Sequence, residues 1–152
     1  HRKYNFRIFV EPQVYPVYVV RFMQINNIDG NIVNPFDWGE YLIWKLPKSK
    51  VSIDGRYETV YTREVMDKNW DFSMGLKNRH AILEDYSSEI ILTRRSDGTR
   101  RTLDGETAWV KIHEDPTAAL YVRDTPRMQP VLRKFYAKEL VDVLERPSDA
   151  FP

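Results

Sequence analysis

Apolar and polar positions of the first half of the chain follow patterns typical of β-strands. Apolar side chains occupy every second position of residues 4–10, which predicts a half-buried strand. Residues 14–25 are apolar on both faces and rich in valine and aromatic side chains, so they predict a central strand whose start is interrupted by Pro16. Asp54 and Gly55 separate two short β-prone runs and indicate a hairpin.

A second β-prone region covers residues 89–114. Two Asp-Gly pairs, at 97–98 and 104–105, divide it into three short runs, which predicts a three-strand meander. The preceding residues, 63–86, mix polar and apolar types without a clean period. They predict one or two helical turns and an exposed connection.

Two segments carry helix signals. Residues 35–46 follow Asn34 as a candidate N-cap and stop at Pro47, which predicts a short helix with a wide aromatic face. Residues 126–146 place apolar side chains at spacings of three and four, which predicts a C-terminal amphipathic helix. Residues 147–152 predict an extended tail.

These elements predict one α+β domain over residues 1–146, since a chain of 152 residues fits a single core. The expected architecture is a mostly antiparallel, twisted sheet or small open barrel of about six strands, with the two helices packed on it. Hydrophobic residues make up 42% and charged residues 30% of the chain, which is typical of a globular protein.

Composition excludes several kinds of chemistry. The chain has no cysteine, which excludes disulfides, thiolate metal sites and cysteine nucleophiles. Its net charge of +1 argues against a large phosphate-binding face. The longest strongly apolar stretch, residues 14–20, is much shorter than the ~20 residues of a membrane helix. Because the chain begins at His1, we expect a processed product or an excised domain, and mitochondria are the suggested compartment.

Arginines mark the first candidate site. A hairpin turn at 97–98 would place Arg95 opposite Arg100 and Arg94 opposite Arg101, and like charges that face each other need an anion nearby. The anion is either Asp97, Asp104 and Glu106 of the chain itself or an external acidic or phosphate partner, and the four arginines are the predicted anion- or partner-binding site.

Histidines and tryptophans are further candidates. His80 and Glu84 share a helix face at a spacing of four, and His113 precedes two carboxylates, but neither completes a metal site or a catalytic motif. We therefore predict no metal, no cofactor and no catalytic residue. Trp38 and Trp44 lie within apolar patterns and are predicted to be interface aromatics.

These observations favour a non-catalytic structural or accessory subunit of a larger multiprotein assembly, with other protein subunits as its partners and a mitochondrial complex as the suggested assembly. A ribosomal or other RNA-contacting module that uses the arginine-rich hairpin is the first alternative, which the balanced charge disfavours. A small β-rich enzyme or carbohydrate-binding module is the second alternative, and it would use His113 with Glu114 or the tryptophans. Trp38, Trp44, Trp70 and Trp109 could form a flat platform for sugar rings, although their apolar surroundings favour burial.

Overall fold

The computed structural model describes residues 9–56 and 59–143. Most of the strand predicted over residues 4–10 lies outside the described residues. The same is true of the tail predicted over 147–152 and of residues 144–146 of the predicted C-terminal helix.

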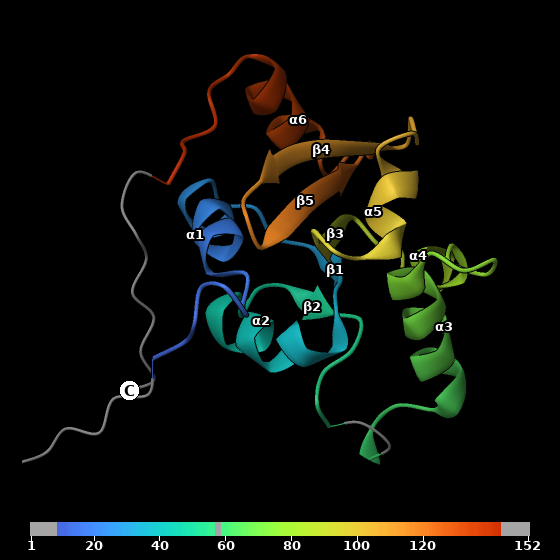
Figure 1. Ribbon diagram of the computed structural model, residues 1–152. Coiled ribbons are helices and arrows are strands. Elements are labelled where there is room, and N and C mark those ends of the chain that lie inside the picture. Colours follow the sequence, from blue (N-terminus) through green and yellow to red (C-terminus); the bar gives the residue numbers. More distant parts are fainter. Residues whose placement is uncertain (1–8, 57–58, 144–152) are drawn as a thin grey trace, which may run out of the picture.

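A five-stranded open sheet forms the centre of the molecule (Figure 1), in the order β2-β1-β3-β5-β4. Its strands are β1 (Asn31–Val33), β2 (Lys50–Val51), β3 (Ile90–Arg94), β4 (Trp109–Glu114) and β5 (Ala118–Arg123). β1 pairs in parallel with β2 and β3, through two residue pairs each, whereas β5 pairs antiparallel with β3 and β4, through five pairs each. The predicted α+β class with a mostly antiparallel sheet is confirmed.

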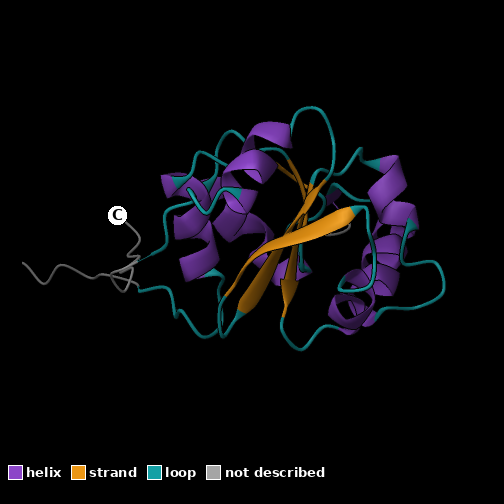
Figure 2. Cartoon of the chain, turned by 90° about the horizontal axis from the view of Figure 1, so that it is seen from above, coloured by secondary structure: helices purple, strands orange, loops and turns teal. Residues whose placement is uncertain are grey.

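Helices cover both faces of this sheet (Figure 2). One face packs against α1 (Val17–Ile25), α2 (Gly39–Lys45) and α6 (Gln129–Tyr136), with the 3-10 helix η1 (Phe36–Trp38) leading into α2. The other face packs against α3 (Arg63–Met74), α4 (Ala81–Asp85) and α5 (Gly98–Leu103). Each layer therefore has its own hydrophobic core, and the sheet separates the two cores.

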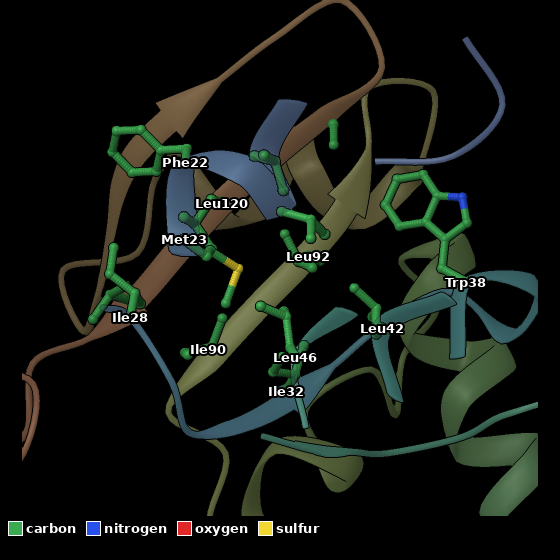
Figure 3. Packing of buried hydrophobic residues seen from close by; sticks show 14 of the residues in the cluster. Phe22, Met23, Ile28, Ile32, Trp38, Leu42, Leu46, Ile90, Leu92 and Leu120 are labelled. Atoms are coloured by element: carbon green, nitrogen blue, oxygen red, sulfur yellow. The ribbon is translucent and has the colours of Figure 1, made fainter. Parts of the chain in front are cut away.

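Alternation along the strands assigns side chains to the two cores. On β3, Ile90 and Leu92 contact the first core, whereas Ile91 contacts the second. Figure 3 shows Met23 of α1 and Leu120 of β5 close to these first-core residues. All five side chains are fully buried, so removal of any one of them would leave a cavity.

β2 and β3 lie on opposite sides of β1, so the chain crosses the sheet in one direction and then in the other. From β1 the chain runs through α2 to β2, and then returns through α3 and α4 to β3 on the other side of β1. Right-handed crossovers to opposite sides of one strand place their helices on opposite faces of the sheet, as observed. The loops that follow β1 and β3 consequently separate at one edge, and a crevice at such an edge is the usual ligand site of parallel sheets.

The strand predicted over residues 14–25 is wrong, because residues 17–25 form α1. Pro16 lies at the residue before this helix, where its missing N–H costs nothing. Val17, Val20 and Met23 are all buried at a helical spacing of three. Burial of one helix face therefore outweighs the weak β-preference of valine.

The two predicted Asp-Gly turns at 54–55 and 97–98 do not form hairpins. Asp54 is instead a buried side chain in the connection between β2 and α3. Gly98 begins α5, so the middle strand of the predicted meander is a helix, which buries Thr99 and Leu103 one turn apart. A β4–β5 hairpin exists, but its turn is at 115–117, and the sequence pattern did not indicate β5.

The predicted helix over 35–46 is confirmed by η1 and α2. The C-terminal helix is shorter than predicted, because α6 ends at Tyr136 and Lys138 adopts a left-handed backbone with a φ of 57°. Residues 63–86 contain more helix than predicted, since α3 alone has 12 residues. Across residues 9–56 and 59–143, no helix combines the length and the apolar character that a membrane crossing requires.

Candidate functional site: a cleft at the carboxyl ends of the parallel strands

A cleft of about 900 Å³ opens at the edge where β1 and β3 end and their loops separate. Three segments line it: the loop from β1 into η1, the region between β2 and the end of α3, and the residues after β3. The lining residues are Phe36, Asp37, Ile53, Tyr61, Arg63, Met66, Asp67, Asn69, Trp70, Ser73, Met74, Arg94 and Asp97. The cleft thus occupies the position where open sheets with parallel strands bind ligands.

An ion pair joins η1 to the end of β3. Arg94 Nη2 donates to Asp37 Oδ1, and the Arg94 guanidinium lies 5.2 Å from the centre of the buried Trp38 ring. Asp97 Oδ2 accepts the Arg94 backbone N–H at 3.0 Å. Burial raises the pKa of the Asp97 carboxyl, against the opposing influence of Arg94. Two carboxylates and one guanidinium therefore meet at this wall of the cleft.

One face of α3 forms the opposite wall. Met66, Trp70, Ser73 and Met74 follow each other at spacings of four, three and one, so they lie on the same face of the helix. The other face buries Phe72 against the sheet. α3 consequently presents apolar and polar side chains to an open cleft.

Buried amides connect the walls beneath the cleft. Asn34 Nδ2 donates to the Ile53 carbonyl at 2.9 Å, and Asn34 Oδ1 accepts the Ser52 backbone N–H at 3.1 Å. Asn69 Nδ2 of α3 donates to the Asn34 carbonyl at 3.1 Å and to Ser52 Oγ at 3.3 Å. This network ties α3 to the ends of β1 and β2, because buried amides require partners.

Asp54 organises the connection that leads from β2 to α3. Its buried carboxylate accepts the Arg56 backbone N–H at 3.0 Å, the Arg56 Nε–H at 2.8 Å and the Tyr61 hydroxyl at 2.8 Å. The side-chain hydrogen bond from Arg56 is the main reason that the pKa of Asp54 falls to about 2. The connection is therefore held by one ionised group, and Tyr61 is placed at the cleft.

Glycines allow two close backbone contacts near the cleft. A Cβ at Gly39 would lie 2.3 Å from the Ile53 carbonyl oxygen. At the end of α3, Gly75 has a φ of +68° and packs against Gly98, where a Cβ would lie 2.4 Å from the Met74 carbonyl oxygen. Side chains at these positions would push α2 from the β2 loop, or α5 from α3.

The structure separates the four predicted arginines. Arg94 lies in the cleft, whereas Arg95 Nε contacts Glu114 at 3.2 Å and Arg100 also donates to Glu114. Arg101 is exposed and makes no ion pair with the residues that the structure describes. Because Arg100 and Arg101 belong to a helix, the predicted cross-strand arginine pairs do not exist. Three of the four arginines already contact carboxylates, which offers no support to an RNA-contacting role.

The two tryptophans predicted to be interface aromatics do not line the cleft. Trp38 is completely buried and donates its indole N–H to the Val14 carbonyl at 2.9 Å. Trp44 is half-buried, with its ring centre 6.1 Å from that of Tyr41.

The two candidate histidines, His80 and His113, also lie outside the cleft. His80 Nε2 lies 3.4 Å from Glu106, and His113 stacks on Phe22 with ring centres 4.1 Å apart. Burial lowers the pKa of His113. Within the described parts of the chain, no group of three or more histidine or acidic side chains is arranged to hold a metal ion.

Sequence reasoning did not identify Asp37, Asp97, Asn69 and Ser73 as site residues, and it favoured burial for Trp70, which is 63% exposed. A usable signal exists for the first of these, because it follows a short apolar run that ends in an asparagine. Polar residues just after parallel strands gather at one sheet edge. With only three residues in β1 and two in β2, that signal is too short to distinguish from a loop.

No protein-family model matches the sequence, and the comparisons with curated proteins and with solved structures found no match.

Proposed function

We propose that this chain is a non-catalytic recognition subunit of a larger protein assembly, and that its cleft holds a polar ligand. One observation carries the proposal: a cleft of about 900 Å³ at the carboxyl ends of β1 and β3 combines apolar side chains with both charges. Apolar walls with a few convergent polar groups are typical of small-molecule sites. The Asp37–Arg94 pair and the amide network beneath it support these groups from the sheet.

We expect small polar ligands to bind in this cleft. In a nitrogen–proton NMR screen of the intact chain with a library of polar fragments, amide shifts should change at residues 34–38, 61–74 and 94–98. Ser73→Phe should abolish these changes, because the added ring occupies the cleft. Lys77→Phe adds the same ring at an exposed position outside the cleft lining and should leave them intact. Shift changes centred on α6, or no binding in the cleft, would contradict the proposal.

Apolar side chains beside the cleft support the assembly role. Val60 and Leu76, which flank α3 and lie outside the cleft lining, expose 52% and 46% of their surface. Exposed apolar surface is often surface that a partner covers. The neighbourhood of α3 is therefore the proposed contact region for another subunit.

We expect the isolated chain to self-associate through this region. Sedimentation velocity should show larger species as concentration rises, and the double change Val60→Ser with Leu76→Ser should shift the chain towards monomer. Ile43→Ser on α2 removes a comparably exposed side chain elsewhere and serves as the control. A parent chain that stays monomeric at every concentration and co-purifies with no partner would refute the assembly role.

A further inference from the structure

Trp70 is the cleft residue with the largest exposed ring. It exposes 63% of its surface and lies at the middle of the α3 face that lines the cleft. Among the described residues, no ring, cation or hydrogen-bond partner is found for its indole. An indole is large, flat and apolar with one N–H donor, so it suits a ligand that has an apolar face and a polar edge.

Polar groups around this ring supply both donors and acceptors. Arg94 and Arg63 bring N–H donors, Asp67 and Asp97 bring acceptors, and the Ser73 hydroxyl can do either. Only one oxygen of the Asp97 side chain has a hydrogen bond among the described residues, to the Arg94 backbone N–H. A ligand whose every polar group both donates and accepts can match this arrangement, and hydroxyl groups have that property.

Charge argues against an anionic ligand. The cleft lining holds three aspartates and two arginines, so a phosphate group would meet a net negative charge. Arg94 is paired with Asp37, and Arg63 Nε lies 4.0 Å from Asp67 Oδ2. Asp97 is thus the one cleft carboxylate without a side-chain cation within ion-pair distance among the described residues. A hydroxyl group of an uncharged ligand can donate a hydrogen bond to this carboxylate.

The cleft is also the right size for such a ligand. Sites for drug-sized molecules range from about 300 to about 1,000 Å³, and this cleft has about 900 Å³. We propose that it binds an uncharged carbohydrate, with one sugar ring stacked on the Trp70 indole and hydroxyl groups bound by Asp97, Ser73 and Arg94. This inference rests on the proposed function, because it names the ligand class of the same cleft.

Tryptophan fluorescence gives a direct test. The chain has four tryptophans, of which Trp38 and Trp109 are buried and Trp44 is half-buried, so the emission of Trp70 responds most to a ligand. We would titrate the intact chain with uncharged disaccharides built from glucose, galactose, mannose and N-acetylglucosamine, and confirm binding by calorimetry. At least one disaccharide should cause a saturable change in emission.

Substitutions locate the binding. Stacking on an aromatic side chain is worth about 1–3 kcal/mol per ring for nucleobases, so Trp70→Ala should weaken disaccharide binding by about fivefold to about 150-fold, as read by calorimetry. Trp70→Tyr keeps a ring and should restore part of the loss. Tyr136→Ala removes an equally exposed ring on α6 and should change nothing.

Three results would overturn the carbohydrate inference. The first is that no disaccharide binds, and the second is that Trp70→Ala binds the disaccharides as well as the parent chain. The third is saturable binding of tetramethylammonium or inorganic phosphate in the absence of disaccharide binding. If polar fragments still bind the cleft in the NMR screen, only the carbohydrate class fails; if nothing binds there, the proposed function fails with it.

Discussion

Replacing Gly39 with alanine is expected to lower the free energy of unfolding by about 3 kcal/mol. A Cβ at this position would lie 2.3 Å from the Ile53 carbonyl oxygen and 2.4 Å from the Asp54 Cα. Both atoms belong to the backbone, so no side-chain rotation relieves the overlap. The chain must instead move α2 away from the connection after β2, which disturbs the packing of Leu42 and Tyr41 in the first core.

Urea denaturation of the parent and the variant at neutral pH measures this difference. Gly105→Ala is the matched control, because the nearest atom to its Cβ would be the Thr102 carbonyl oxygen at 3.6 Å, an ordinary contact. We expect the control to change the free energy of unfolding by less than about 0.5 kcal/mol. Equal effects of the two substitutions would show that α2 does not need this close approach.

Replacing Asp54 with asparagine is expected to cost about 2 kcal/mol at pH 6 and to change how stability depends on pH. Hydrogen bonds from Arg56 and Tyr61 lower the folded-state pKa of this carboxyl from 3.8 to about 2. A lowered folded-state pKa stabilises the fold above pH ~4, and this contribution is lost as the pH falls towards 2. The difference in the free energy of unfolding between parent and variant should therefore be largest at pH 6 and should decrease as the pH falls from 4 to 2.

Urea denaturation at a series of pH values checks the sign of this effect. Asp29→Asn removes an ion pair with Arg127 at 3.0 Å, in which the two side chains are 40% and 53% exposed. Because exposed pairs contribute about 0–1 kcal/mol, this control substitution should change the free energy of unfolding only slightly at every pH. A gap for the Asp54 variant that stays constant down to pH 2 would mean that its ionisation does not stabilise the fold.

Local sequence signals predicted one helix well and misassigned another. Residues 35–46 carry proline at both boundaries, and these signals act within the segment itself, so the helix is where the pattern indicated. In residues 17–25 valine and aromatic side chains favour a strand locally, yet the segment is a helix. Its conformation depends on the partners that bury Val20 and Met23, which come from distant strands.

The Asp-Gly pairs show the same limit at the level of turns. The pair Asp54-Gly55 precedes Arg56, whose side chain donates a hydrogen bond to the Asp54 carboxylate. In the pair Asp97-Gly98, the glycine is the first residue of α5. Neither outcome is visible from the dipeptide, because each depends on what the aspartate side chain contacts. The predicted cross-strand pairing of the arginines is wrong for this reason, since it assumed that the turn at 97–98 joined two strands.

The cleft was beyond the reach of local patterns. Asp37 and Arg94 are 57 residues apart in the sequence and meet only because β1 and β3 are neighbours in the sheet. Trp70 comes from a third segment, which crosses on the opposite face from α2. Strand order therefore decides which side chains form the site, and the short strands β1 and β2 give little sequence signal for that order.

The attachment of α3 at both ends has a consequence for the cost of binding. At its start the helix follows the connection held by Asp54, and at its end Gly75 packs against Gly98. A wall fixed in this way loses little conformational entropy when a ligand arrives, so more of the contact energy remains as affinity. Such preorganisation also favours selection by shape, because a rigid wall cannot adapt to ligands that fit poorly.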